Sequence, residues 1–320
     1  MKTRILALLF CLPALFATTA PDVSASAGTP DFTEDFRPKK TAFAFGVPVP
    51  LPGERMFLVE AKVNGVPAKM LVDTGASHTS LDLSWARKNF PDAKLRIVST
   101  NPAEQNAYAM PAQKIPLMAV AEFSVGGNAF SDFFMPLVDL RGLRAALPEL
   151  NDVAGILGMN TIALAPCRVS FKNRTLAWLD REGLAGTPGK KKLDVRAVPE
   201  TDCVLVMISS PKDGRVLPAL IDCGAVGSSV PADFWIGARP EKIRAVTTTA
   251  AGTQNVEIAF GVPGELKFSE DFSLKNISPE LLPPVGNAPQ KILLGLDALS
   301  RFDLIFDREK GEVFAVPLEN

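Results

Sequence analysis

Two aspartates, each set in a short glycine turn, are the residues of this chain best suited to chemistry. Residues 70–84 read MLVDTGASHTSLDLS and residues 219–233 read ALIDCGAVGSSVPAD, and the two stretches align without a gap, with Asp73 over Asp222. Two carboxyl groups a few ångströms apart cannot both ionise cheaply, so they share one proton. If the copies meet across a pseudo-two-fold axis, one carboxylate can deprotonate a water while the other hydrogen-bonds the carbonyl that the water attacks.

The elements around each aspartate also occur twice. Each is preceded by two apolar stretches joined by a polar turn, Asn64-Gly65 in the first copy and Asp213-Gly214 in the second, a pattern that predicts β-hairpins. A second repeated motif follows later, Ile-Leu-Gly ending at Gly158 and Leu-Leu-Gly ending at Gly295. After each glycine the sequence predicts a strand, a turn and a strand.

The spacing of the two motifs differs between the copies. Asp73 precedes Gly158 by 158 − 73 = 85 residues, whereas Asp222 precedes Gly295 by 295 − 222 = 73 residues. We expect the 12-residue difference to be loop insertion. Short helices are expected near 85–89 and 297–300. The predicted organisation is a signal peptide (1–27), a flexible lead-in (28–40), an N-terminal lobe (41–180), an exposed linker (181–194) and a C-terminal lobe (195–320). The lysine run 190–192 lies in the predicted linker.

Composition excludes several classes of protein. Hydrophobic residues make up 47% of the chain, so a core can form, and 27 Pro with 23 Gly favour a turn-rich β protein. The 34 basic and 35 acidic residues give a net charge of −1, which argues against nucleic-acid binding. A single His and the lack of a Cys-x-x-Cys motif argue against a zinc site.

The N-terminus has the pattern of a secretory signal. Lys2 and Arg4 precede an apolar run at 5–17 that is too short to span a bilayer comfortably, and Ala25-Ser26-Ala27 fits a cleavage site. Cleavage after Ala20 and an uncleaved membrane anchor are the alternatives. No later stretch is long and apolar enough to span a membrane, so we expect a secreted or periplasmic protein without a stable membrane span after signal cleavage.

Cleavage after Ala27 leaves three cysteines, Cys167, Cys203 and Cys223. A Cys167–Cys203 disulfide is one expectation for an oxidising compartment, and three buried thiols including Cys223 are the other.

These motifs resemble those of a known family. Val72-Asp73-Thr74-Gly75-Ala76-Ser77 resembles the active-site signature of retropepsin-like aspartic proteases, and Ile221-Asp222-Cys223-Gly224-Ala225 resembles a divergent second copy. The two apolar-apolar-Gly motifs are similar to the family strand that passes beside the Asp loop. The resemblance implies an all-β, bilobal fold of two related closed β-barrel lobes with pseudo-two-fold symmetry and few short helices. It also implies a cleft between the lobes and a β-hairpin flap over that cleft.

The resemblance also implies a function and roles for the motif residues. It implies an aspartic endopeptidase in which Asp73 and Asp222 are catalytic, acting on peptides or proteins without a metal or other cofactor. Because one chain carries both aspartates, a monomer is the expected active unit. The expected supports of the two loops are Thr74, Gly75, Ala76, Ser77, Cys223, Gly224 and Ala225.

The second copy departs from the family pattern at two positions. Cys223 replaces the usual hydroxyl residue, which predicts a lopsided grip between the loops with Thr74 contributing more. Val226 stands where the first copy has Ser77, so the second loop loses a polar group. The alternative function is therefore a non-catalytic pseudoprotease that binds extended peptides in the cell envelope.

Two further residues are weaker candidates. Tyr108, the only Tyr, lies where a first-lobe flap is expected, in the polar, alanine-rich stretch NPAEQNAYAMPA. His78, the only His, is interpreted either as a contact at the rim of the cleft or as a surface or partly buried residue after the Asp loop.

Overall fold

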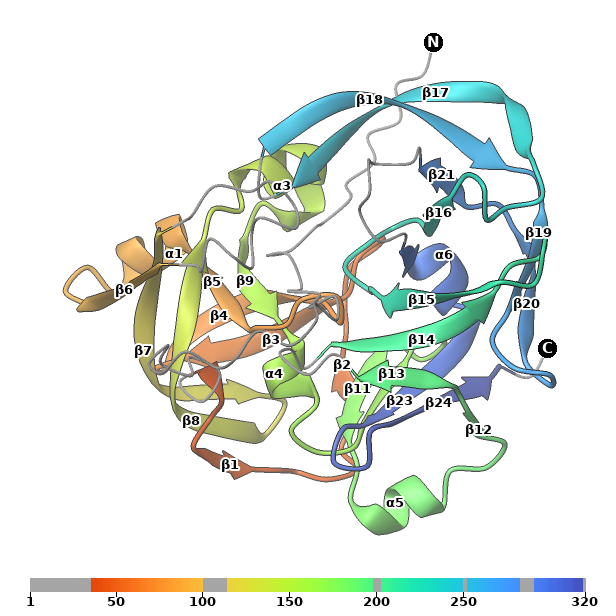
Figure 1. Ribbon diagram of the computed structural model, residues 1–320. Helices are drawn as coiled ribbons and strands as arrows, with labels where there is room; N and C mark the ends of the chain where they lie inside the picture. Colours follow the sequence, from red (N-terminus) through yellow and green to blue (C-terminus); the bar gives the residue numbers. More distant parts are fainter. Residues whose placement is uncertain (1–35, 100–113, 198–202, 250–251, 283–290, 319–320) are drawn as a thin grey trace, which may run out of the picture.

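The fold is described by a computed structural model for residues 36–99, 114–197, 203–249, 252–282 and 291–318. Strands dominate it, and its α-helices are only four to seven residues long, as the all-β prediction requires. Figure 1 shows one lobe built from the first half of the described chain and a second lobe built from the second half. The predicted signal peptide and the flap candidate Tyr108 lie outside the described residues.

The first lobe is a closed barrel. Six strands form a ring in the order β8-β5-β9-β4-β3-β7, and β7 pairs with β8 to close it. Strand β1 pairs with the outside of β8, and β6 with β7. The strands are β1 (Lys40–Ala42), β3 (Leu58–Val63), β4 (Val66–Val72), β5 (Ser80–Asp82), β6 (Leu95–Ser99), β7 (Lys114–Val125), β8 (Asn128–Val138) and β9 (Val153–Leu157).

The hairpin that leads into Asp73 has the predicted turn. Asn64 and Gly65 form the two-residue connection between β3 and β4, with φ angles of 45° and 81°. Both residues need positive φ in this kind of tight turn, which Asn and Gly adopt most readily. The sequence signal and the backbone therefore agree here.

The second lobe repeats this order around an open sheet. Its strands are β13 (Val195–Ala197), β14 (Val204–Ser209), β15 (Val216–Ile221), β16 (Ser229–Pro231), β17 (Ala238–Thr249), β18 (Gly252–Gly261), β19 (Gly264–Lys267), β20 (Ser273–Ile277), β21 (Glu280–Leu282) and β22 (Ile292–Leu294). Strands β14 and β15 form the hairpin predicted before Asp222.

The prediction of two closed barrels is corrected in this lobe. In the first lobe, β8 is continuous and pairs with both β7 and β5. In the second lobe these pairings are divided between β20, which pairs with β19, and β21, which pairs with β16. Asn276 has a φ of 58°, and Pro279 lacks the N–H that a continuous ladder would use. The ring is interrupted there, and no pairing among the described residues closes it.

A six-stranded sheet joins the lobes. Its order is β12-β24-β23-β10-β11-β2, and β10 pairs antiparallel with β23, so the two halves of the chain meet in one ladder. Buried residues on these strands belong to the same hydrophobic core as both lobes. The strands are β2 (Val49–Pro50), β10 (Cys167–Ser170), β11 (Thr175–Trp178), β12 (Lys191–Lys192), β23 (Phe302–Asp307) and β24 (Glu312–Pro317).

A buried carboxylate links the halves further. Asp303 is 2% exposed in its side chain and pairs with Arg168 at 2.7 Å across the β10–β23 junction. Its other oxygen accepts a hydrogen bond from the Phe171 N–H at 2.9 Å. The lobes are therefore fixed to each other by a shared sheet and by a buried ion pair, which restricts their relative movement.

The segment predicted as an exposed linker contains regular structure. Helix α5 (Arg181–Ala185) is capped by Asp180, and β12 pairs with β24. The Lys190 ammonium donates to the carbonyl oxygens of Leu184 and Ala185 instead of only facing solvent. Lys190 thus binds within the connecting segment, while Lys191 and Lys192, which form β12, attach it to the shared sheet.

Helix α3 (Arg141–Ala146) and the 3-10 helix η2 (Pro148–Leu150) are inserted between β8 and β9. Together with helix α1 (Leu83–Asn89), they account for extra length in the first lobe. The second-lobe hairpin β17–β18 arches over to α3, and β17 contacts this helix (Figure 1). A hairpin of one lobe therefore reaches a helix of the other.

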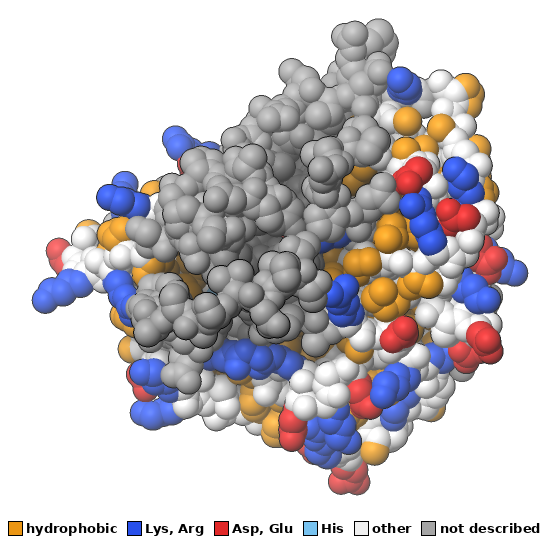
Figure 2. All heavy atoms as spheres, viewed as in Figure 1, with side chains coloured by type: hydrophobic (Ala, Val, Ile, Leu, Met, Phe, Trp, Pro, Cys, Tyr) orange, Lys and Arg blue, Asp and Glu red, His pale blue; other side chains and the backbone are white. Residues whose placement is uncertain are grey.

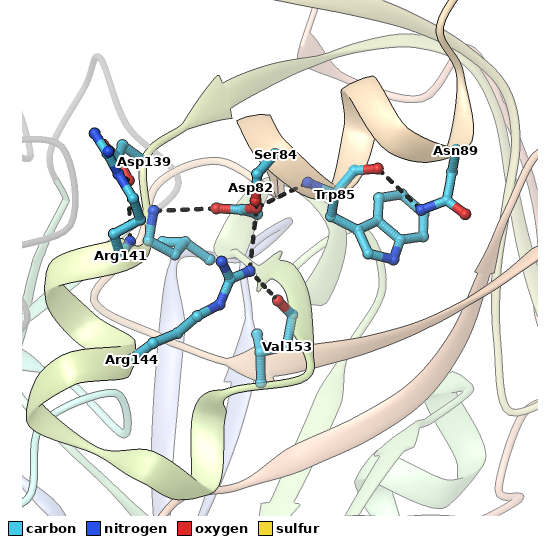
Figure 3. A network of polar contacts seen from close by, with 9 residues as sticks. Asp82, Ser84, Trp85, Asn89, Asp139, Arg141, Arg144 and Val153 are labelled. Atoms are coloured by element: carbon cyan, nitrogen blue, oxygen red, sulfur yellow. Dashed lines mark hydrogen bonds and ion pairs between the residues drawn. The ribbon is translucent and has the colours of Figure 1, made fainter.

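A buried ion pair holds α3 on its lobe (Figure 3). Asp82 accepts hydrogen bonds from the N–H groups of Trp85, at 2.9 Å, and Leu140, at 3.2 Å, and lies 3.1 Å from the Arg144 guanidinium. Arg144 also donates to the Val153 carbonyl oxygen at 2.6 Å. Burial favours a higher pKa for Asp82, but these contacts and one from Ser84 outweigh it and lower the pKa.

Two further observations concern the outer surface. On the described part of the face in Figure 2, basic and acidic side chains are interspersed, and neither sign dominates. No helix of the described residues is both long enough and apolar enough to cross a membrane.

Candidate active site

Each Asp loop begins where a central strand ends. Strand β4 runs parallel to β9, and β15 runs parallel to β22. The Asp73 N–H donates to the Leu157 carbonyl oxygen at 3.0 Å, and the Asp222 N–H donates to the Leu294 carbonyl oxygen at 2.9 Å. The repeated apolar-apolar-Gly strand thus fixes the start of both loops.

The two aspartates face each other. A Cβ atom added to Gly75 would lie 2.6 Å from Cγ of Asp222, and one added to Gly224 would lie 2.5 Å from Cγ of Asp73. Each carboxyl group therefore rests against the glycine that follows the other aspartate by two residues. The aspartates are 0% and 1% exposed.

Backbone donors orient both carboxyl groups. One oxygen of Asp73 accepts from the N–H groups of Gly75, at 2.8 Å, and Ala76, at 3.1 Å. One oxygen of Asp222 accepts from the Gly224 N–H at 2.8 Å. Burial, the charge of Asp73 and a hydrogen bond to its carboxyl group raise the pKa of Asp222 well above its ordinary value. The two carboxyl groups can therefore hold one proton between them.

Thr74 and Cys223 interlock beneath the aspartates. The Thr74 hydroxyl accepts from the Cys223 N–H at 3.0 Å and donates to the Ile221 carbonyl oxygen at 2.9 Å. The Cys223 thiol accepts from the Thr74 N–H at 3.4 Å and donates to the Val72 carbonyl oxygen at 3.3 Å. The expected lopsided grip is therefore symmetric in its pattern of partners, and the thiol differs from the hydroxyl only in its longer contacts.

The later glycines allow a close approach to the Asp loops. A Cβ on Gly158 would lie 2.5 Å from the backbone of His78, and a Cβ on Gly295 would lie 2.4 Å from the Gly227 carbonyl oxygen. Any side chain at either glycine would push the strand away from its loop. The amides that follow them donate to the Ala76 and Ala225 carbonyl oxygens, at 2.8 and 2.9 Å.

A repeated hydroxyl residue was missed by the sequence reasoning. The Gly158 N–H donates to the Thr79 hydroxyl at 3.1 Å, and the Gly295 N–H donates to the Ser228 hydroxyl at 3.0 Å. Both hydroxyls lie six residues after an aspartate in the gapless alignment. A hydroxyl residue six positions after each aspartate was therefore the sequence signal that could have predicted these contacts.

The second departure from the family pattern has a packing explanation. Val226 packs against a buried apolar cluster of the first lobe that includes Ala76, Leu140 and Leu143. Its counterpart, Ser77, contacts His78 Nδ1 through its hydroxyl at 2.8 Å. Val226 therefore exchanges a polar contact within its own lobe for an apolar contact between lobes.

His78 is partly buried next to the Asp73 loop. Its ring lies 4.5 Å from the ring of Phe36, centroid to centroid. Burial, with a smaller contribution from Arg37, lowers the pKa of His78 to about 4. The imidazole is thus neutral near pH 7, in agreement with its interpretation as a partly buried residue.

The three described cysteines are free, buried thiols, so the Cys167–Cys203 disulfide is not formed. The Cys203 thiol donates to the Gly75 carbonyl oxygen at 3.6 Å and so contacts the first Asp loop. Within the described ranges, no group of three or more His, Cys, Asp or Glu side chains is arranged to hold a metal ion.

Comparison with known proteins agrees with this geometry. Residues 59–161 match a family model described as aspartyl protease. The matched range contains the first Asp loop and the first apolar-apolar-Gly motif. This part of the chain is therefore similar to aspartyl proteases, in agreement with the resemblance of the sequence motifs. No curated protein matches the chain significantly.

Proposed function

We propose that the protein is an aspartic endopeptidase whose two catalytic groups are Asp73 and Asp222. The observation that carries the proposal is the mutual contact of two buried carboxyl groups, each held by backbone donors of its own loop. Carboxyl groups in this arrangement share one proton and can supply both an acid and a base.

In the proposed reaction, a water molecule lies between the two carboxyl groups. Asp73, whose charge is stabilised by two N–H donors, takes a proton from the water as its oxygen attacks the amide carbon. Asp222 gives its proton to the carbonyl oxygen, which forms a neutral diol. The diol then collapses: one of its hydroxyl groups returns a proton to Asp222 as the C=O bond re-forms, and the proton held by Asp73 passes to the leaving nitrogen as the C–N bond breaks.

Two features support an active enzyme over a non-catalytic peptide-binding protein. The Cys223 thiol makes both of the contacts that a hydroxyl would make, and Val226 packs against the first lobe. Neither substitution removes a donor to the carboxyl groups.

We further propose that the enzyme acts as a monomer in the cell envelope, because one chain supplies both aspartates and its N-terminus has the pattern of a secretory signal.

The test is digestion of a peptide library between about pH 3 and 8, with and without pepstatin. The native protein should cleave peptides, and Asp73→Asn and Asp222→Asn should each abolish cleavage. The double variant should be no worse than either single variant, because the groups act as a unit. Asp271→Asn, a change at an exposed aspartate paired with Lys191, is the matched control and should cleave like the native protein. Substantial cleavage by either dyad variant would disprove the proposal.

A further inference from the structure

A second buried carboxyl group lies near the Asp222 loop and has no role in the proposed reaction. Glu280 begins β21, is 2% exposed, and pairs in register with Ser229 of β16, the strand that follows the loop. Its N–H donates to the Ser228 carbonyl oxygen at 2.9 Å. We use the name Glu280 cluster for Gly227, Ser229, Glu280 and Asp297.

Two polar atoms of the Glu280 cluster lack partners. Oε2 of Glu280 and the hydroxyl oxygen of Ser229 are both buried, and neither has a hydrogen-bond partner in the structure. Because paired residues of neighbouring strands project to the same face of a sheet, the two side chains lie on one face. Buried polar groups are nearly always satisfied in folded proteins, so these two atoms indicate a site that takes a polar partner.

Gly227 leaves one side of this carboxyl group without a covering side chain. A Cβ atom on Gly227 would lie 2.9 Å from Oε1 of Glu280, and Gly227 itself is partly exposed. The first lobe has His78 at the equivalent position, five residues after its aspartate, and packs that ring against Phe36. Only the second lobe therefore combines a missing side chain with a buried acid.

The position of the Glu280 cluster relates it to the expected cleft between the lobes. The residue before Gly227 is Val226, which packs against the first lobe. On its other edge β21 pairs with β18, with Phe260 opposite Glu280, and the β17–β18 hairpin reaches α3 of the first lobe (Figure 1). Glu280 thus lies between the Asp222 loop and the base of a hairpin that connects the lobes. A peptide bound across both aspartates would pass the Asp222 loop, which Glu280 adjoins through Ser229.

The charges of the Glu280 cluster determine which kind of group it would bind. Burial, together with the nearby charge of Asp297, raises the pKa of Glu280 to about 8. Asp297 accepts from the Ser228 hydroxyl at 2.6 Å, and burial raises the pKa of Asp297 despite this contact and the opposing charge of Arg301. A cationic group inserted beside Glu280 would meet two carboxyl groups and one hydroxyl, all of which can accept hydrogen bonds from it.

We infer that Glu280 selects a basic side chain, lysine or arginine, in the peptide substrate. The inference rests on the proposed endopeptidase function and specifies its substrate class. The charged head of the side chain would donate to Oε2 of Glu280 and to the Ser229 hydroxyl, while its aliphatic stem would pass over Gly227. The chemical step remains that of the aspartate pair.

The experiment begins with the same library digest, scored for enrichment of residues on each side of the cleaved bonds. Two peptides that differ only in lysine or norleucine at the enriched position are then compared by kcat/KM. We expect the native enzyme to prefer lysine by at least about tenfold, the effect of one hydrogen bond to a charged group. In Glu280→Gln the ratio should fall close to one.

Two further variants make the comparison specific. Gly227→Ala adds a methyl group that displaces the flexible Glu280 carboxyl group, so the lysine preference should fall in this variant as well. Glu312→Gln is the matched control: it removes a carboxylate that pairs with Lys192 on the shared sheet, and it should keep the native ratio. Thermal unfolding of each variant verifies that it is folded.

A binding measurement separates this inference from the proposed function. In Asp73→Asn, which should bind peptides without cleaving them, calorimetry should show tighter binding of the lysine peptide than of the norleucine peptide. Cleavage with no preference for a basic residue, or a preference that persists in Glu280→Gln, would overturn the inference alone. A native protein that neither cleaves nor binds peptides would overturn both.

Discussion

Thr74 and Cys223 each satisfy the backbone of the opposite lobe. Each side chain accepts a hydrogen bond from the other residue's N–H and donates to the carbonyl oxygen two residues before the other residue, over 2.9 and 3.0 Å for the hydroxyl and 3.3 and 3.4 Å for the thiol. Sulfur is larger than oxygen and forms longer contacts, so the same four backbone groups are satisfied with either atom. The interlock fixes the two Asp loops in register.

The first prediction tests this interlock. Cys223→Ser should keep both contacts and change the free energy of unfolding by less than about 1 kcal/mol. Cys223→Ala should lower it by about 1–3 kcal/mol, because a buried N–H and a buried carbonyl oxygen lose their partners. Thr74→Val should have an effect of the same size. Urea unfolding of the three variants measures these differences, and a harmless Cys223→Ala would show that the thiol does not contribute to the grip.

The second prediction concerns the glycines beside the carboxyl groups. Gly75→Ala places a Cβ 2.6 Å from Cγ of Asp222, so that carboxyl group must move. A displacement of this kind should lower kcat/KM by about 100-fold. Gly224→Ala should do the same through Asp73.

The matched control for these glycines is Gly237→Ala. The nearest atom to its added Cβ is 3.8 Å away, on Val262, so kcat/KM should stay at the native value. The variants are compared with peptides that the native enzyme cleaves. Native rates in both Gly75→Ala and Gly224→Ala would mean that the carboxyl groups do not need this geometry.

Repetition made the core of the fold and of the site predictable. The gapless alignment around Asp73 and Asp222 predicted a pair of related loops, and the structure brings the two carboxyl groups together. The turn at Asn64-Gly65 was predictable because few residues tolerate its backbone angles. These features depend on local residue types at fixed spacing.

Features that depend on contacts between distant segments could not be predicted in this way. The sequence shows Val226 as a lost hydroxyl, and only the position of the first lobe shows its apolar contacts. The break between β20 and β21 coincides with Pro279, which lacks a backbone N–H, but the pairing of β21 with β18 does not follow from any local residue. Glu280 is an ordinary surface residue type in the sequence, and its burial is a property of the folded chain.

The third prediction concerns the ion pair that holds α3. Arg144→Met leaves the Asp82 carboxylate, which is 1% exposed in its side chain, without its cationic partner. The free energy of unfolding should fall by about 2–3 kcal/mol, at the low end for a broken buried pair because the N–H donors of Trp85 and Leu140 remain. Arg141→Met, on the same helix, removes only an exposed pair with Asp139 and should cause no measurable change.

A double variant separates the ion pair from the packing of the arginine stem. Asp82→Asn combined with Arg144→Met removes the buried charge together with its partner, so the loss should be smaller than the sum of the two single losses. Strictly additive losses, measured by urea unfolding, would mean that the two side chains do not stabilise each other.

The fourth prediction is a pH dependence of stability caused by Glu280. Its pKa rises from 4.5, the ordinary value expected in the unfolded chain, to about 8 in the folded protein, so the folded state binds more protons between these values. The stability that the protonated group contributes is therefore complete below about pH 4.5 and is lost as the pH rises toward 8. In Glu280→Gln this loss is absent. The raised pKa of Asp297 affects both proteins and largely cancels in the comparison.

The measurement is urea unfolding of the native protein and of Glu280→Gln at pH 4, 6 and 8. The variant should gain stability relative to the native protein as the pH rises, with a slope of at most about 1.4 kcal/mol per pH unit, the value for one proton. Glu312→Gln is the control, because the bond to Lys192 lowers the pKa of Glu312 and favours its ionised form. Ionisation of Glu312 therefore cannot cause a loss of stability as the pH rises. Parallel pH profiles for the native protein and Glu280→Gln would show that the carboxyl group ionises in the folded chain as readily as in the unfolded chain. That result would contradict its burial beside Asp297.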